Sequence, residues 1–235
     1  MDGLRSYFSG ITLIFKPGVR RFVWIPFFIN LLLFTLATWL LWTYMSSVLV
    51  SLLPVWLDWL SWLLVPLFSI ITLLLVYFGF SLLANIIAAP FYVYLARDVE
   101  CYLRGEPNEP VNNNSLIKEA LSIIGLELRK IMYYLVRATP LLVLSIIPGI
   151  NIISLPLWLL FSAWFLTFEY MGYFFENHQV LFKEQKSHMQ SDRVNHIVFG
   201  SISLFAASVP VFNLFSPAIG VAGATKMLVE TEQYQ

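Results

Sequence analysis

The sequence is poor in charged residues. Only 12% of its 235 residues are charged, whereas 59% are hydrophobic, and the mean hydropathy is +0.76. Soluble domains carry about 25% charged residues, and one soluble core of this length cannot bury so much apolar surface. We therefore expect an integral membrane protein. The formal net charge is zero, which argues against nucleic acid as a partner.

Features of several enzyme classes are also missing. The chain has no Gly-x-x-x-x-Gly-Lys motif for ATP, and the spacing of His178, His188 and His196 fits no common metal site. We therefore expect neither catalytic residues nor a metal or cofactor.

The single cysteine, Cys101, can form no internal disulfide, and its polar sequence context indicates the reducing cytoplasm. No cleavage pattern follows the basic start, so we expect the first hydrophobic segment to be retained.

The chain has long hydrophobic runs instead. Four apolar blocks occupy residues 22–57, 59–96, 138–168 and 197–225, and the first has no charged residue in 36 positions. A helix that crosses about 30 Å of hydrocarbon needs about 20 apolar residues, so each of the first two blocks can hold a complete span. Asp58 marks the turn between them. Residues 22–96 are thus predicted to form a transmembrane hairpin of two long helices.

Proline and asparagine interrupt the last two blocks near their middle. The first arms, 138–147 and 197–209, would reach only about 15 and 20 Å into the bilayer as helices. The breaks repeat a Pro-x-x-Asn pattern, which predicts re-entrant helical hairpins over 138–175 and 197–229. The alternative is a pair of ordinary proline-kinked spans. The predicted pore or tip residues are Asn85, Pro148, Gly149, Asn151, Pro210 and Asn213.

The polar segment 97–137 is predicted to contain a loop over 106–114 and then an amphipathic helix. Apolar residues recur at helical spacing after Ser115, and the polar positions include Glu119, Glu127, Arg129 and Lys130. This helix lies at the membrane interface, or it lines a pore or contacts a partner. The basic segments fit one side of the membrane, which the positive-inside rule makes cytoplasmic. A polar cluster of Glu169, Glu176, Asn177 and His178 is expected to give structural support.

Residues 1–21 form a predicted amphipathic entrance segment that ends in Pro17-Gly18-Val19-Arg20-Arg21, directly before the first block. Free backbone N–H groups and two guanidinium groups could converge there on a small oxyanion. Residues 3–57 contain no Asp or Glu, and a site with donors only favours fully ionised sulfate over protonated phosphate. The alternative is an arginine pair that binds lipid phosphate.

Seven motifs in register across nearly the whole chain resemble bacterial sulfate permeases of the CysZ family. They are Pro-Gly-Val-Arg-Arg-Phe-Val at 17–23, Ala-Asn-Ile-Ile-Ala-Ala-Pro-Phe at 84–91, Ile-Pro-Gly-Ile at 147–150, Leu-Phe-Ser-Ala-Trp at 160–164, Glu-Asn-His at 176–178, Phe-Lys-Glu at 182–184 and Pro-Val-Phe-Asn-Leu-Phe at 210–215. The resemblance implies a multi-pass, oligomeric inner-membrane protein that admits sulfate for cysteine synthesis. It also implies a sulfate site at Gly18, Val19, Arg20 and Arg21. One departure is Gly172, where the family pattern has an aspartate.

We thus expect one integral membrane domain over residues 1–235 that transports sulfate and is no enzyme. Two alternatives stay open, namely transport of another oxyanion such as sulfite, thiosulfate or phosphate, and a membrane scaffold without transport. Half-inserted hairpins leave polar tips that neighbouring subunits would cover, so we also expect a homo-oligomer surrounded by lipid. Small residues between Ser201 and Gly223 could form the surface between subunits.

Overall fold

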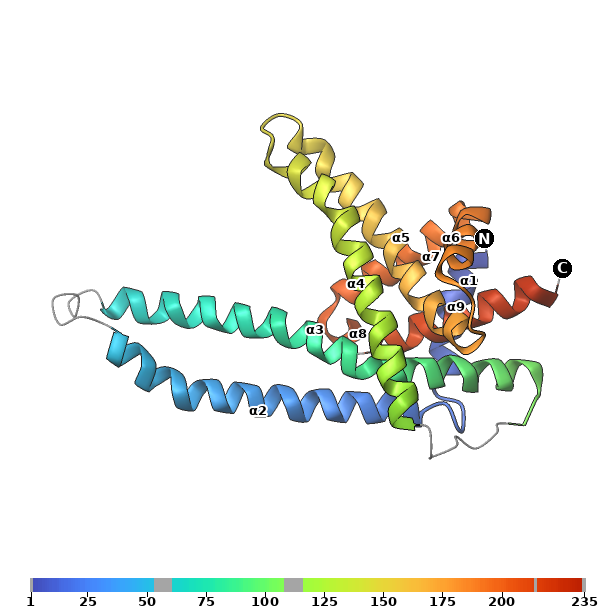
Figure 1. Cartoon of the computed structure of the whole chain (residues 1–235), viewed down its shortest axis with the longest axis horizontal. Helices are drawn as coiled ribbons and strands as arrows, with labels where there is room; N and C mark the ends of the chain where they lie inside the picture. The colour runs from blue at the N-terminus through green and yellow to red at the C-terminus, as the bar shows by residue number, and fades with distance from the viewer. Residues whose placement is uncertain (1, 53–60, 108–115, 214, 234–235) are drawn as a thin grey trace. The chain divides into compact units, whose positions relative to one another are not determined.

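The computed structural model describes residues 2–52, 61–107, 116–213 and 215–233, and its regular elements there are all α-helices (Figure 1). The predicted all-α class is confirmed. In chain order the helices are α1 (Asp2–Leu13), α2 (Arg21–Leu52), α3 (Ser61–Arg104), α4 (Leu116–Ile146), α5 (Asn151–Asn177), α6 (Phe182–Ser191), α7 (Arg193–Ser208), α8 (Pro210–Asn213) and α9 (Ser216–Gln233). They fall into two compact units, Ile25–Ala88 and the combination of Met1–Trp24 with Ala89–Gln235.

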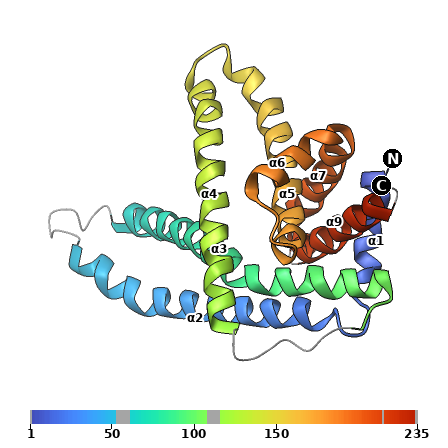
Figure 2. The ribbon, with the colours of Figure 1, turned by 45° about the vertical axis from the view of Figure 1, so that its right-hand side comes forward.

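The unit Ile25–Ala88 consists of the greater part of α2 and the first part of α3, which run in opposite directions (Figures 1 and 2). Leu32, Trp39 and Trp62 are largely exposed on these helices. Apolar side chains on an exposed helical surface are typical of helices that face lipid. Both arms of the predicted hairpin are helical, whereas the predicted turn at Asp58 lies outside the described residues.

Two helical segments of the described residues are long and apolar enough to cross a membrane, Arg21–Trp39 and Asn151–Asn177. The first coincides with the start of the predicted hairpin. The second lies where the sequence predicts a half-inserted arm, and its 27 residues extend about 40 Å as a helix. Its length therefore also fits the alternative of an ordinary span.

In the other unit, α5 packs against α4, α7 and α9, while α1 packs against α7 and α9. Phe168, Tyr173 and Phe199 are fully buried in this core. Gly10 of α1 faces the backbone of α9 so closely that a Cβ there would clash with the carbonyl oxygen of Ile219. Glycine thus permits the close approach of these two helices, which join the two ends of the chain.

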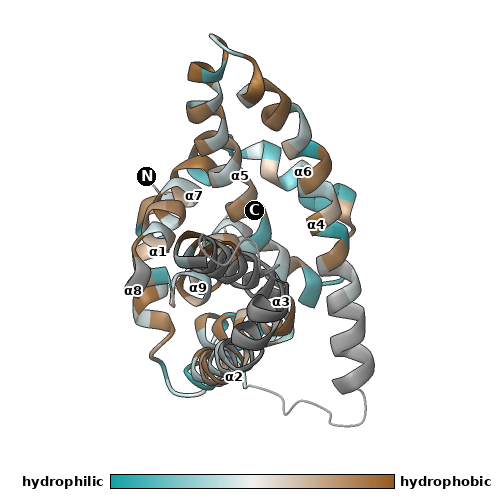
Figure 3. Cartoon of the chain, turned by 90° about the vertical axis from the view of Figure 1, so that its left-hand side faces the viewer, coloured by the Kyte–Doolittle hydropathy of each residue, from teal (hydrophilic) through white to brown (hydrophobic). Residues whose placement is uncertain are grey.

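The predicted break at Pro148 and Gly149 is confirmed as the turn between α4 and α5. Gly149 adopts φ +87°, which glycine allows without steric cost, and the Asn151 N–H donates to the Ile147 carbonyl at 3.0 Å. The arms are longer than the apolar block indicates, because α4 runs through Pro140 and has 31 residues. The apolar arm that starts at residue 138 is therefore the last part of a longer helix. Figure 3 shows apolar residues on both arms near the turn.

The second break is also present but differs from the first. After α7 ends at Ser208, the short α8 leads into α9, and α8 contacts both α7 and α9. Residues 218–225 of α9 are almost wholly buried in the core. Gly200 packs against Ala163, and Gly223 packs against α1. Gly223 and the other buried small residues of α9 are therefore used for packing within the chain, whereas Ser201 and Ser208 of α7 are exposed, so a surface between subunits stays a prediction for α7.

Candidate functional site

The predicted anion-binding segment is the turn that connects α1 to α2. Gly18 has φ +92° and lets the chain turn back, and α2 begins at Arg21. Val19 is 1% exposed, so its side chain anchors the turn in the core and cannot face a ligand. The N–H groups of Val19 and Arg20 both donate to the Lys16 carbonyl, at 3.2 and 3.3 Å. The expectation that these backbone donors are free is therefore wrong.

The two arginine side chains of this turn are exposed, and they differ in their partners. Arg21 Nη2 lies 3.2 Å from Oδ2 of Asp98 on α3, and its guanidinium carbon lies 4.6 Å from the centre of the Phe22 ring. The Arg20 side chain makes no ion pair or hydrogen bond with any described residue. Asp98 thus orients one guanidinium, while the other is available to a ligand.

Asp98 corrects the expectation that no carboxylate lies near the arginine pair. The sequence places the nearest acidic residues far away, but α3 brings Asp98 back to the start of α2. Its side chain is only 1% exposed, so its oxygens are covered by protein. An anion at this turn therefore still meets donors at the surface, because the acceptor behind Arg21 does not reach solvent.

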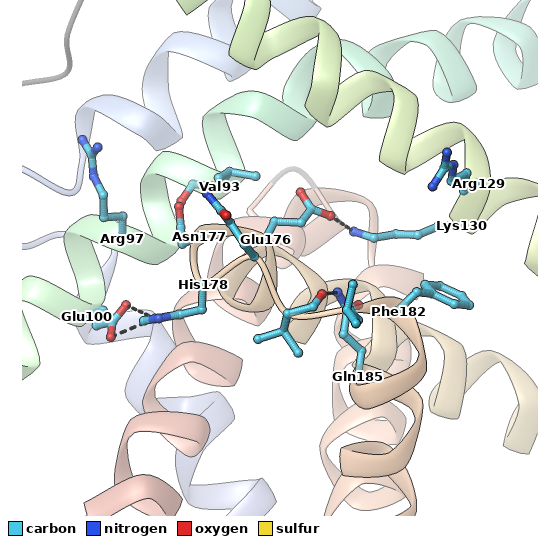
Figure 4. Close-up of a pocket in the computed structure, with 13 residues that line it drawn as sticks. Val93, Arg97, Glu100, Arg129, Lys130, Glu176, Asn177, His178, Phe182 and Gln185 are labelled. Carbon is cyan, nitrogen blue, oxygen red and sulfur yellow. Dashed lines mark hydrogen bonds and ion pairs between the residues drawn. The ribbon is translucent and has the colours of Figure 1, made fainter. Parts of the chain in front are cut away.

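A cavity of about 630 Å³ lies in the same unit, among α3, α4, α6 and the end of α5 (Figure 4). The sequence did not predict it, because its walls come from segments far apart in the chain. Arg97 and Glu100 of α3 form one side, and Arg129 and Lys130 of α4 form the other. The turn after α5, which includes His178, completes the wall.

Lys130 and Glu176 form a buried ion pair in this wall. The Nζ–Oε1 distance is 2.5 Å, and each side chain is 4% exposed. Lys130 also lies over the Tyr173 ring, with Nζ 4.6 Å from its centre. Lys130 thus lies on the polar side of the helix, as the spacing predicts, but this position is covered by α5 and is not at the surface. A Cβ at Gly172 would lie 2.7 Å from Lys130 Nζ, so the position at which the family motif departs faces the same ammonium group.

Two further members of the predicted polar cluster, Asn177 and His178, contact α3. His178 Nε2 lies 2.9 Å from Oε2 of Glu100, and Arg104 Nε lies 2.9 Å from the other oxygen of that carboxylate. Asn177 donates from Nδ2 to the Val93 carbonyl at 2.9 Å, which ties the end of α5 to α3. His188 and His196 pack ring against ring with centres 5.9 Å apart.

The predicted tip residues of the two breaks lie at two separate turns. Pro148, Gly149 and Asn151 lie exposed at the α4–α5 turn, whereas Pro210 and Asn213 lie in α8, beside α7 and α9 (Figures 1 and 3). Asn85 lies within α3, and its side chain is outside the described residues. A shared pore at these tips thus remains a prediction.

Comparison with known proteins identifies the family of this chain. The sequence profile of the family described as sulfate transporter CysZ/etoposide-induced protein 2.4 matches residues 6–217. Proteins named sulfate transporter CysZ from two strains of Pseudomonas aeruginosa and from Pseudomonas paraeruginosa are each 38% identical over 236 residues, covering 99% of this chain and 96% of theirs. The chain belongs to the CysZ family of sulfate transporters.

Membership of the CysZ family confirms the resemblance inferred from the seven motifs. The family is one of membrane transporters and not of enzymes, in agreement with the sequence interpretation. What the motifs did not reveal is the cavity, since Arg97, Glu100 and Arg129 stand in none of them. The sequence signals for the cavity were the Glu-Asn-His motif at 176–178, which lines it, and the concentration of both charge signs in the segment 97–137.

Proposed function

We propose that the protein admits sulfate through the bacterial inner membrane into the cytoplasm, where it supplies cysteine biosynthesis. The observation that carries this proposal is the exposed Arg20–Arg21 pair at the start of the candidate span Arg21–Trp39. Sulfate is a dianion without a proton, and guanidinium groups bind such oxyanions with charge-assisted hydrogen bonds. Gly18, Val19, Arg20 and Arg21 would form this first site, with Val19 acting through the turn that it anchors.

In this proposal residues 1–235 form one multi-pass membrane domain. The segment 22–96 is a transmembrane hairpin, the segments 138–175 and 197–229 are half-inserted hairpins, and the amphipathic part of α4 lies at the membrane interface. Exposed Ile146, Ile152 and Leu155 near the α4–α5 turn support contact of this tip with lipid. The basic segments face the cytoplasm.

We also propose that the protein is a homo-oligomer, because two long helices and two half-inserted hairpins do not enclose a wet path by themselves. Residues 218–225 of α9 are packed within the chain, so of the predicted segment Ser201–Gly223 mainly the exposed small residues of α7 could contribute to a surface between subunits. The exposed apolar faces of the helices in Ile25–Ala88 offer such a surface. Native mass spectrometry in mild detergent should show a multimer; a monomer that conducts sulfate would refute this part.

The test of the proposed function is uptake of radiolabelled sulfate into liposomes that contain only this protein, with and without a proton gradient. Sulfate should accumulate above protein-free liposomes, and unlabelled sulfate should compete better than phosphate, sulfite or thiosulfate. Stronger competition by one of these would favour transport of another oxyanion. Absence of any uptake would favour the scaffold alternative.

A further inference from the structure

We propose that Arg97 is the centre of a second, inner binding site for sulfate, in the cavity behind the surface arginine pair. This inference rests on the proposed function, because it takes sulfate as the anion. It adds a site that does not depend on the turn at residues 18–21. The argument depends on how the charges that line the cavity are paired.

The carboxylates of the cavity already have partners of their own. Glu176 is paired with Lys130, and Glu100 contacts both His178 and Arg104. Neither carboxylate therefore remains to balance a further positive charge. In the described part of the chain, Arg97 and Arg129 contact no carboxylate, so the cavity keeps an excess of positive charge.

Arg97 is the more strongly constrained of these two arginines. Its Nε and Nη2 atoms are buried and find no hydrogen-bond partner among the described residues, and its guanidinium carbon lies 5.4 Å from the centre of the Tyr94 ring. Arg97 as a whole is half-buried, but two buried guanidinium nitrogens without an acceptor are costly, and deprotonation cannot relieve this cost. An oxyanion would supply the missing acceptor, and a tetrahedral dianion can also satisfy two cationic groups at once.

The position of Arg97 relates this cavity to the surface pair. The next residue along α3 is Asp98, which holds Arg21, and Glu100 lies one turn further along the helix. Successive residues of a helix are rotated by about 100°, so one turn of α3 contacts the surface turn with one side and lines the cavity with another. An anion released from Arg20 and Arg21 would thus find the next unbalanced guanidinium within the same unit.

The inner site is tested by equilibrium binding of radiolabelled sulfate to the full-length protein in detergent. We expect the Arg20→Ala/Arg21→Ala variant to retain residual binding and the further substitution Arg97→Gln to weaken that binding at least about tenfold, since a charge-assisted contact is lost. Arg97→Lys should preserve part of it. The matched control is Arg137→Gln, which changes an exposed arginine of α4 that stacks on Tyr133 outside the cavity.

The outcomes separate this inference from the proposed function. If Arg20→Ala/Arg21→Ala binds no sulfate, or if adding Arg97→Gln leaves its binding unchanged, the inner site is overturned even when the wild-type protein transports sulfate. If wild-type liposomes take up no sulfate, the proposed function fails instead. If Arg97→Gln does not give a monodisperse protein, the test uses Arg97→Lys in the same Arg20→Ala/Arg21→Ala background. Lysine keeps the charge but lacks the planar set of guanidinium donors, so sulfate binding should be weaker than in the parent variant. Binding equal to that of the parent would overturn the inner site.

Discussion

At the scale of single residues, the sequence indicated which charged side chains matter, but it did not indicate which residues they pair with. Arg20 and Arg21 could be singled out because two adjacent cations precede a long uncharged run. The partner of Arg21 could not, since Asp98 is 77 positions away and only the fold brings it near. The partner of Lys130 could not be predicted for the same reason, because Glu176 reaches it from another helix. Helical spacing predicts a face but not what covers that face.

The buried pair Lys130–Glu176 gives a prediction about stability. Lys130→Met should destabilise the protein by about 3–5 kcal/mol, because it leaves an uncompensated buried carboxylate. The double variant Lys130→Met/Glu176→Leu should recover most of that loss, since apolar side chains of similar volume can replace a buried ion pair. Denaturant unfolding in detergent measures both. Equal destabilisation in the single and double variants would mean that the pair is not isolated from water.

His196 gives a prediction about pH. Burial lowers the pKa of His196, although a hydrogen bond to the Met189 carbonyl at 3.1 Å opposes the shift. The folded protein therefore binds this proton less well than the unfolded chain, whose histidine pKa is about 6.5. The stabilisation is complete above that pH and is lost as the pH falls toward the lower folded pKa.

Thermal unfolding between about pH 7.5 and pH 5 tests this sign. The Tm of the wild-type protein should fall more steeply with decreasing pH than that of His196→Gln, which keeps a donor for the Met189 carbonyl but does not titrate. Parallel curves for the two proteins would show that another group controls the acid response.

At the scale of elements, local signals located the breaks but not the extents. Pro148-Gly149 and Pro210 interrupt helices as predicted, because proline lacks an N–H and glycine accepts positive φ. The apolar block begins at residue 138 because it follows the charged residue Arg137, whereas the helix that contains its first arm already begins at Leu116. Changes in hydropathy mark membrane depth and do not mark helix ends.

The contact between α1 and α9 gives a prediction at this scale. Gly10→Ala should destabilise the protein by about 1–3 kcal/mol, because the added methyl group meets the backbone of α9, which cannot move without separating the helices. The control is Gly125→Ala on α4, where a Cβ meets no atom within 4 Å and where alanine should be neutral or stabilising by up to about 1 kcal/mol. Denaturant unfolding compares them. Similar effects of both substitutions would contradict the close packing.

At the scale of the whole molecule, composition alone gave the membrane class, since so apolar a chain has no soluble alternative. The composition did not show how far each helix extends into the membrane. A ten-residue apolar arm appears too short to span, yet α4 and α5 have 31 and 27 residues. The polar half of such a helix can lie outside the bilayer or face protein within it. The sequence therefore leaves half-inserted and spanning arrangements open.

Accessibility of the two tips separates these arrangements. In a Cys101→Ser background, single cysteines at exposed Ile150 and Phe212 are labelled by a reagent that does not cross the membrane, with exposed Lys183→Cys as the marker of one side. Half-inserted hairpins predict that neither tip labels fully from the side opposite Lys183. Full labelling of both tips from that side would show that the segments are complete spans.

The central claim is that sulfate enters at the arginine pair at the start of α2 and then crosses the membrane. Its most direct test is the initial rate of radiolabelled sulfate uptake into liposomes that contain either the wild-type protein or Arg20→Ala/Arg21→Ala, with equal amounts of folded protein inserted. Two charge-assisted contacts, each contributing roughly 1.5–3 kcal/mol, are lost, so uptake at low sulfate concentration should fall at least about tenfold in the variant. Equal rates for the two proteins would contradict the claim.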